Sequence, residues 1–213
     1  MPDLTCIYYT SNKEKPDFEA RVRQTLIENM GDTQLISVSQ KPIDFGKNIC
    51  VGEVGVSNHN AFRQLQIGAM EAKTPFVCSA ESDFIYPPDY FNRIPVENNE
   101  FYMAYTVFMV YDYQYFRFRR YNEGAMIVGR DYLVEAIEEM LDGNGMWSSE
   151  RALPSLFKGK NTRTIKLKNP IVTFKTDHNM HQKGRREYTK LEEIASIPYW
   201  GKADELVKRY YEA

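Results

Sequence analysis

The sequence has few cysteines and no long hydrophobic run, and both absences narrow the class of protein. Its 213 residues include only three cysteines, Cys6, Cys50 and Cys78, with no C-x-x-C pair. An odd number of cysteines in apolar surroundings predicts reduced thiols rather than a disulfide framework. No apolar run approaches the roughly 20 residues of a membrane span, and the start, MPDLTCIYYT, does not resemble a signal peptide. We therefore expect a soluble cytoplasmic protein.

The chain also lacks a large net charge, but its charges are unevenly distributed. The net charge of -2 does not predict the broadly basic surface of a protein that coats nucleic acid. The segment 151–190, however, contains 11 lysines and arginines and 2 acidic residues, a net charge of +9. Such a segment indicates an anionic ligand, such as phosphate, pyrophosphate or nucleic acid. The alternative is a solvated face that balances acidic helices elsewhere.

Hydrophobic periodicity in the first half of the chain alternates between strands and helices. The length and the 43% hydrophobic content fit a single domain, 1–213. A loop around a short strand is expected within 41–58. The β-α-β order predicts parallel strands covered by helices. We expect strands at 4–11, 34–40 and 75–80, and helices at 17–30 and 58–73, the second capped by Asn58 or Asn60.

The second half is richer in aromatic residues and predicts a different sheet arrangement. The segments 101–112 and 113–121 are typical of two antiparallel strands at one side of the sheet. A helix at 148–157 would start at Ser148 or Ser149. The remaining expected elements are strands within 124–130, 164–168 and 170–175, and helices at 131–145 and 202–213. Together the halves predict an α/β fold with a parallel N-terminal half and antiparallel additions.

Two carboxylates, Glu81 and Asp83, stand at the end of the apolar strand 75–80. Side chains alternate along a strand, so both point to the same side, and a buried charge is costly unless it is paired or binds a metal. Open α/β sheets bind ligands at the carboxyl ends of their parallel strands. Because Mg²⁺ and Mn²⁺ prefer carboxylate oxygens and bridge phosphates, a metal–diphosphate site is expected here. A cap at Glu81 and a turn at Asp83 are the structural alternatives.

The segment 57–91, SNHNAFRQLQIGAMEAKTPFVCSAESDFIYPPDYF, resembles the nucleotide-sugar glycosyltransferases of GT-A type, and the family-2-like group in particular. In that group a helix of the form A-R-N-x-G-x-x-x-A leads through a turn into an apolar strand that ends in D-x-D. Gly68 and Ala72 occupy the small positions, and Glu81-Ser82-Asp83 stands at the D-x-D.

The sequence departs from this pattern at three positions. Gln66 stands where the family has Asn, Leu65 stands where it has Arg, with Arg63 two residues away, and the first carboxylate is Glu81. These departures leave open a degenerate transferase that binds the donor without turnover.

The resemblance covers roughly residues 4–95 and implies a GT-A-like mixed sheet with helices on both faces. It further implies a nucleotide-sugar-binding half, 1–95, and an acceptor-binding half, 96–213. The donor would be a nucleoside-diphosphate sugar, with a UDP-sugar favoured, and the cofactor Mn²⁺ or Mg²⁺ bound by Asp83 and Glu81. The residues assigned to the donor in the first half are Tyr9, Thr10, Ser11, Asn12, Asn58, Arg63, Glu81 and Ser82.

A weaker continuation of the resemblance concerns catalysis. The segment 123–137 looks like the strand and helix that precede the family's catalytic carboxylate. In the segment that follows, MWSSERAL, Glu150 is then the candidate general base of an inverting transferase, and Trp147 would stack on the acceptor ring. Alternatively, Glu150 is an acidic residue favoured in the first turn of a helix. A retaining enzyme would not need this base.

Two further segments carry candidate binding residues. In TDHNMHQKGRREY, His178 or His181 would complete the metal site, and Arg185 or Arg186 would hold the pyrophosphate through bidentate contacts. A flexible basic surface loop is the alternative. The aromatic run 101–121 is typical of a packed sheet face, or of an acceptor platform with Asp112.

Arginines beside these aromatics also permit a nucleic-acid acceptor, as in a phage-type enzyme that glycosylates modified DNA bases. The hydroxyl acceptor would then be modified DNA rather than a glycan. One competing activity is nucleotidyl transfer, but such enzymes usually carry a glycine-rich loop after the first strand, and YYTSNKEKPDF has no glycine. The other alternative, a non-enzymatic module that binds nucleic acid or a protein partner, leaves Glu81 and Asp83 unexplained.

Overall fold

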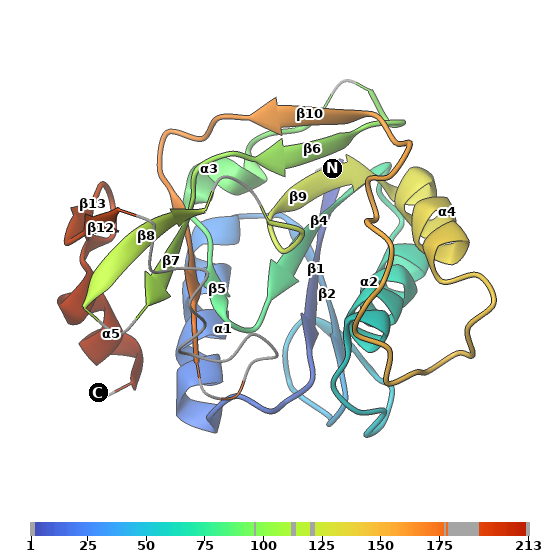
Figure 1. Ribbon diagram of the computed structural model, residues 1–213, viewed down its shortest axis with the longest axis horizontal. Helices are drawn as coiled ribbons and strands as arrows, with labels where there is room; N and C mark the ends of the chain where they lie inside the picture. Colours follow the sequence, from blue (N-terminus) through green and yellow to red (C-terminus); the bar gives the residue numbers. More distant parts are fainter. Residues whose placement is uncertain are drawn as a thin grey trace.

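The computed structural model describes residues 3–95, 97–111, 114–119, 122–176, 178 and 192–211. Its main element is a mixed sheet in which β1 to β4 run parallel, as predicted (Figure 1). β9 pairs antiparallel with both β4 and β6, and β10 extends the sheet parallel to β6. In spatial order the seven strands are β10 (Thr162–Ile165), β6 (Phe101–Ala104), β9 (Met126–Gly129), β4 (Phe76–Glu81), β1 (Leu4–Thr10), β2 (Gln34–Ser39) and β3 (Lys47–Cys50).

A second sheet is built mostly from the later part of the chain. Its order is β12 (Glu193–Ile194), β8 (Tyr115–Arg119), β7 (Val107–Tyr111), β11 (Ile171–Phe174) and β5 (Phe84–Ile85). A two-stranded ribbon, β13 (Ser196–Ile197) with β14 (Gly201–Lys202), lies after it.

The expected continuous strand 101–112 is wrong, because the chain passes from one sheet to the other in its middle. The amide of Tyr105 donates to Ile165 O in the first sheet, whereas Thr106 O accepts from the amide of Ile171, which begins β11. The antiparallel pairing of β7 with β8 is as predicted, but it belongs to the second sheet.

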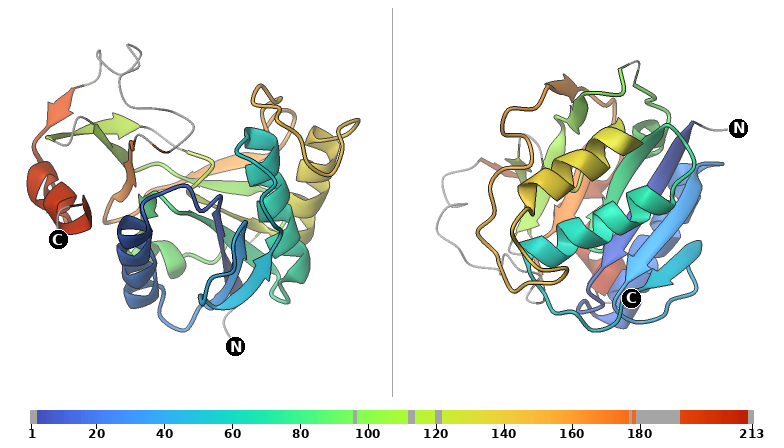
Figure 2. Two further views of the ribbon diagram at one scale, coloured as in Figure 1. Left: turned by 90° about the horizontal axis from the view of Figure 1, so that it is seen from below. Right: turned by 90° about the vertical axis from the view of Figure 1, so that its right-hand side faces the viewer.

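Five helices lie among the described residues: α1 (Pro16–Met30), α2 (Asn58–Glu71), α3 (Pro88–Phe91), α4 (Arg130–Met140) and α5 (Ala203–Tyr211). α2 and α4 lie side by side on one face of the seven-stranded sheet, and α1 covers the other (Figure 2). The alternation along β1 serves both faces, since Tyr8 packs on the α1 side and Ile7 on the α2 side. A Cβ at Gly68 would come within 2.4 Å of Ile7 Cγ2, which explains the small residue in α2.

Local expectations failed at two helix boundaries and for one whole helix. The N-cap of α2 is Ser57, whose Oγ accepts from the Asn60 amide at 3.0 Å, and neither Asn58 nor Asn60 is the cap. α4 ends at Met140 rather than at 145. The expected helix 148–157 is wrong, because this segment is a loop. Pro154 lacks the amide that a helix interior needs, and the backbone at 148–151 bonds to the start of α2 instead.

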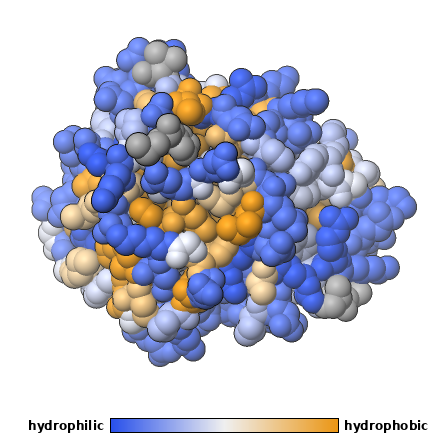
Figure 3. Space-filling model, turned by 180° about the vertical axis from the view of Figure 1, so that it is seen from behind, coloured by the Kyte–Doolittle hydropathy of each residue, from blue (hydrophilic) through white to orange (hydrophobic). Residues whose placement is uncertain are grey.

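No helix within the described ranges combines the length and apolar character needed to cross a membrane. On the back of the molecule, hydrophobic residues gather in a patch bounded by polar ones (Figure 3). Over the whole described surface, the large apolar side chains that are exposed are Ile27, Met70, Ile94, Met146 and Tyr199.

Candidate functional site

A cavity of about 360 Å³ lies at the carboxyl edge of β1 and β4. The N-terminal part of α2, the loop after α4 and the ends of β8 and β11 complete its wall. The sequence-predicted residues that line it are Tyr9, Ser11, Asn58, Glu81, Ser82, Asp83 and His178. The two strand ends meet here because β1 and β4 are parallel neighbours, with Tyr9 opposite Glu81 in the pairing register.

Glu81 is tied to the neighbouring strand end. The Tyr9 hydroxyl donates to Glu81 Oε1 at 2.7 Å. Burial, and then the charge of Asp83, raises the pKa of Glu81 to about 7, although the Tyr9 hydrogen bond lowers it. Gly124 leaves room for this carboxylate, since a Cβ there would lie 2.6 Å from Glu81 Oε1. Glu81 therefore changes its charge near neutral pH.

Asp83 is buried, with 7% of its surface exposed, and faces the second sheet. Its carboxylate accepts from Thr173 Oγ1 at 3.4 Å, and its backbone carbonyl accepts from the Phe174 amide at 2.8 Å. Lys175 follows β11 directly and also lines the cavity. Burial lowers the pKa of Lys175, and the charges of Asp83, Glu81 and Glu14 oppose that shift. Lys175 is thus a cation of the chain itself whose charge interacts with the strand-end carboxylates.

Glu14 is a third cavity carboxylate, contributed by the turn between β1 and α1. Its Oε1 accepts from Thr176 Oγ1 at 2.8 Å, while Oε2 is buried and has no hydrogen-bond partner among the described residues. Burial, and then the charge of Asp83, raises the pKa of Glu14 to about 8. Below that pH the carboxyl group is mostly protonated and can donate a hydrogen bond to a ligand from this open atom, and above it the ionised group can bind a cation.

Three of the predicted donor-binding residues do not line the cavity. Thr10 Oγ1 accepts from the amide of Asn12, which has a positive φ of 54°. Asn12 Oδ1 in turn accepts from the amides of Gln40 and Lys41, so that Asn12 joins the ends of β1 and β2. Arg63 bonds to Glu138 of α4 instead. Thr10 and Asn12 thus stabilise the strand ends rather than line the cavity.

Arg63 and Gln66 join α2 to α4. Arg63 Nη1 donates to Gln66 Oε1 at 2.6 Å and to Glu138 Oε2 at 2.8 Å, and Gln66 Nε2 donates to the same Glu138 oxygen at 2.9 Å. Two of the departures from the family pattern, at Gln66 and around Arg63, are therefore accounted for by contacts between helices.

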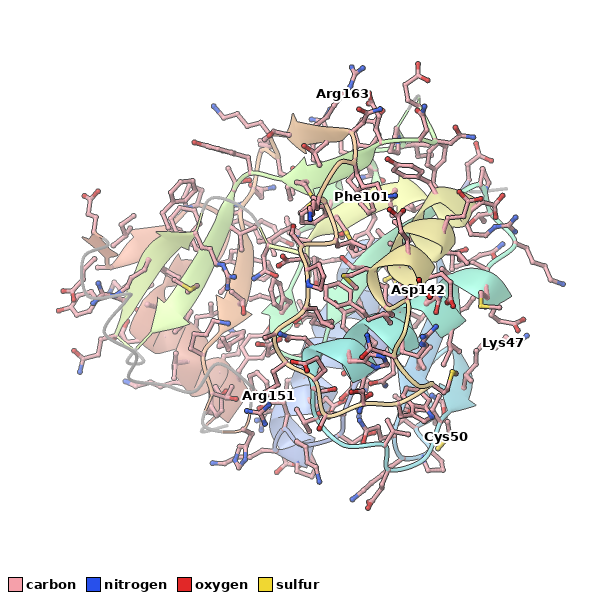
Figure 4. The ribbon with its side chains drawn as sticks, turned by 45° about the vertical axis from the view of Figure 1, so that its right-hand side comes forward. Lys47, Cys50, Phe101, Asp142, Arg151 and Arg163 are labelled. Atoms are coloured by element: carbon pink, nitrogen blue, oxygen red, sulfur yellow. The ribbon has the colours of Figure 1, made fainter. Side chains whose placement is uncertain are left out.

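The loop with the predicted acceptor residues is fastened to the start of α2. Ser57 Oγ donates to Ser148 O at 2.6 Å, the His59 amide donates to Glu150 O at 3.2 Å, and Asn58 Nδ2 donates to Arg151 O. Figure 4 shows Arg151 on this loop, far from Asp142 at its beginning. Residues 153–156 of the loop line the cavity. Trp147 and Glu150 do not line it, and the Glu150 side chain is exposed and accepts from the Ala152 amide.

Four predicted residues, Asp112, His181, Arg185 and Arg186, lie outside the described residues. The sequence reading missed four charged residues of the wall, which are Glu14, Arg119, Glu123 and Lys175. Lys175 had a usable signal, because it is a cation at the carboxyl end of an apolar strand, where ligands of such sheets bind. Glu14 and Glu123 lie in turns, where the sequence has no periodic pattern that would predict the direction of a side chain.

Whether the cavity can hold a divalent metal ion depends on how many ligands its residues supply. Within the described part of the chain, no group of three or more acidic, histidine or cysteine side chains is arranged to hold a metal ion. Mg²⁺, however, is usually held by one or two carboxylates together with substrate phosphates. Asp83 and Glu81 supply two carboxylates, and the open Glu14 oxygen lines the same cavity. The donor set thus fits a metal that arrives with a phosphate-bearing ligand.

Comparison with solved structures identifies the architecture. A glycosyltransferase involved in the glycosylation of the major capsid of PBCV-1 matches with a TM-score of 0.50 and 12% identity, over 80% of this chain and 92% of that chain. The inositol-1-phosphate CTP transferase from T. maritima matches with a TM-score of 0.51 and 8% identity, over 96% of both chains. The fold is GT-A-like. No protein-family model matches the sequence, and no curated protein matches it significantly. At these identities the comparisons establish the fold alone, and the predicted α/β class is confirmed.

Proposed function

We propose that this chain is a glycosyltransferase that moves a hexosyl or pentosyl group from a nucleoside-diphosphate sugar to a hydroxyl acceptor. The observation that carries the proposal is the mixed-charge cavity at the carboxyl edge of β1 and β4, where Tyr9, Glu81 and Asp83 meet. In open α/β sheets this edge is the ligand-binding edge. The resemblance around Glu81-Ser82-Asp83 supports a nucleotide-sugar as the ligand.

The cavity wall offers the two kinds of surface that such a donor needs. Val56, Phe62 and Leu153 give one part of the wall an apolar surface, on which a base or sugar ring can lie. Other lining residues include carboxylates and the two cations Arg119 and Lys175. A UDP-sugar is favoured as the donor, and the acceptor is a hydroxyl group of a glycan or of modified DNA.

Mn²⁺ or Mg²⁺ is the proposed cofactor. Asp83 and Glu81 would bind it, and His178, which also lines the cavity, is the described histidine that can reach the site. When bound, the metal would offset the negative charge that develops on the departing nucleoside diphosphate. Ionised Glu81 is the form that binds a cation, so metal binding is expected to strengthen as the pH rises through about 7.

Inversion with Glu150 as general base remains our proposal from the sequence resemblance. A base must come within hydrogen-bond reach of the acceptor hydroxyl, directly or through one water. Glu123 lines the cavity and Glu150 does not, so Glu123 is the competing base. Glu150→Gln and Glu123→Gln, assayed in parallel, decide between them, because the base variant should retain donor binding and lose transfer.

Nucleotidyl transfer is the second candidate, and the fold match to a CTP transferase over 96% of both chains favours it. The turn after β1 counts against it. A nucleoside triphosphate needs several backbone amides or cations at that turn. Residues 11–15 lack glycine and direct the Glu14 carboxylate into the cavity, whereas Lys13 and Lys15 of the same turn do not line it.

Thermal unfolding in the presence of UDP, GDP, CDP, TDP and CTP, each with Mn²⁺ or with EDTA, tests both candidates. A ligand that binds only the folded chain raises Tm by mass action. Glycosyl transfer predicts a metal-dependent shift with one nucleoside diphosphate, and Asp83→Asn should abolish it. A larger shift with CTP than with any diphosphate would favour nucleotidyl transfer. No shift with any nucleotide would reject both and favour the binding module, for which DNA and RNA would be tested next.

A further inference from the structure

We propose that Lys175 and Arg119 bind the diphosphate of the donor, on the side of the cavity formed by the second sheet. This inference rests on the proposed function and assigns to these two residues the task that the sequence reading gave to Arg185 or Arg186. Both residues line the cavity, Lys175 from the end of β11 and Arg119 from the last position of β8.

Lys175 is a buried cation with unused hydrogen-bonding capacity. Only 5% of its surface is exposed, and its ammonium group carries three N–H donors. Within the described residues the ammonium group makes one hydrogen bond, to Thr173 Oγ1, and that bond is long at 3.4 Å. A buried ammonium group is costly unless it is both paired and hydrogen-bonded. Asp83, Glu81 and Glu14 supply compensating charge, but the free donors still need acceptor atoms.

The guanidinium group of Arg119 lacks even a charge partner, because no ion pair or side-chain hydrogen bond of Arg119 is found in the described part of the chain. Arg117, two residues earlier on the same strand, shows the contrast. Its guanidinium group is paired with Glu193 at 2.5 Å. A half-buried guanidinium group in a cavity wall presents a planar fork of donors, which matches phosphate oxygens.

The two cations lie within electrostatic reach of each other, since the charge of Arg119 contributes to the lowered pKa of Lys175. A ligand with several anionic oxygens would relieve that repulsion. Asp83 and Glu81 line the same cavity and repel a bare anion. A metal–diphosphate would satisfy both groups, because the carboxylates would hold the metal and the cations would bind phosphate oxygens. A nucleoside without phosphates would leave Lys175 and Arg119 unpaired.

The test compares UDP with UMP by isothermal titration in the presence of Mn²⁺. Wild type, Arg119→Met and Lys175→Met are measured, and Arg117→Met serves as the control from the same strand. If the cations hold the terminal phosphate, both variants should weaken UDP binding by about tenfold or more and change UMP binding by less than about threefold. Arg117→Met should bind UDP like wild type.

Unchanged UDP affinity in both variants would overturn the assignment while leaving the proposed function intact. Equal weakening of UDP and UMP would also overturn it, because the effect would then not concern the terminal phosphate. Failure of wild type to bind any nucleoside diphosphate would reject the proposed function together with this inference. Arg119 is only half-buried, so its variant carries the test even if Lys175→Met does not fold.

Discussion

The Tyr9 hydroxyl donates to the Glu81 carboxylate across 2.7 Å and so joins the ends of two parallel strands, β1 and β4. Both side chains line the cavity, and each shifts the other's pKa. Burial, and then the charge of Glu81, raises the pKa of Tyr9 well above its ordinary value. The hydrogen bond, in turn, opposes the rise in the pKa of Glu81. Tyr9 therefore lowers the pH at which the first carboxylate of the E-x-D tripeptide becomes charged, against the larger effects of burial and of Asp83.

Replacing Tyr9 by Phe should raise the pKa of Glu81 above its value of about 7, because the ionised carboxylate loses its hydrogen-bond donor. The free energy of unfolding should fall by roughly 1–3 kcal/mol, the typical cost of an unpaired buried group. The pKa is measured by carbon NMR of the glutamate carboxyl groups. Tyr199→Phe removes a hydroxyl that bonds Asn29 at an exposed position and should leave Glu81 unchanged. An unaltered Glu81 pKa in Tyr9→Phe would contradict the coupling.

Glu14 should make the fold less stable at high pH. Its pKa is about 8 in the folded chain, against an ordinary value of 4.5. A carboxyl group with a raised pKa stabilises the folded state below pH 4.5, and this contribution is lost as the pH rises towards 8. Glu14→Gln keeps an acceptor for Thr176 and cannot ionise. Its Tm should match that of wild type near pH 4.5 and exceed it at pH 8.5. The corresponding gain in the free energy of unfolding is up to a few kcal/mol, at roughly 1.4 kcal/mol per pKa unit. If the Tm of wild type and of Glu14→Gln changed in parallel between pH 4.5 and 8.5, the raised pKa of Glu14 would be refuted.

Gly124 should be needed for the position of Glu81. A Cβ at this residue would come within 2.6 Å of Glu81 Oε1 and 2.9 Å of Phe84 Cζ. Gly124→Ala should therefore displace the carboxylate and weaken metal-dependent nucleotide binding by about tenfold. This change in Kd corresponds to a loss of roughly 1.4 kcal/mol in binding free energy. Gly145→Ala is the matched control, because the nearest atom to its Cβ would be 3.6 Å away. Equal nucleotide affinity in the two variants would show that the carboxylate does not depend on this space.

The contacts at the start of α2 should keep the loop 148–151 closed against proteolysis. Asn58 Nδ2 donates to Arg151 O, and Arg151 is an exposed trypsin site. Asn58→Ala should speed cleavage after Arg151 several-fold, because local opening precedes cleavage. Cleavage after Lys168, an exposed residue between β10 and β11 that Asn58 does not contact, provides the reference rate within the same digest. A ratio of the two rates equal to that of wild type would argue against the role of Asn58 in holding the loop.

The local sequence pattern was sufficient to predict the elements on which the order of the sheet depends. The alternation in 4–11, the helical spacing in 17–30 and the apolar run 75–80 predicted β1, α1 and β4, because each element must bury its own apolar side. The parallel order in turn predicted that Ser11, Glu81 and Asp83 would meet at one edge, and they do line one cavity.

Local pattern failed where long-range contacts decide. An apolar aromatic run does not reveal that the chain changes sheets at Tyr105 and Thr106, because both parts satisfy strand propensity equally well. The segment 148–157 reads as a helix by its own residues, yet its backbone groups bond to the start of α2, 90 residues away in the chain.

The sequence by itself determined the layered α/β architecture and the edge at which carboxylates gather. Only the tertiary structure decided which charges face one another there. Lys175 and Glu14 are separated by most of the chain. Both line one cavity because β11 pairs with β5, which follows β4, and because β1, which precedes Glu14, pairs with β4. The physical reason is that hydrophobic burial is periodic and can be read locally, whereas the pairing of buried charges depends on distances between elements that no local pattern encodes.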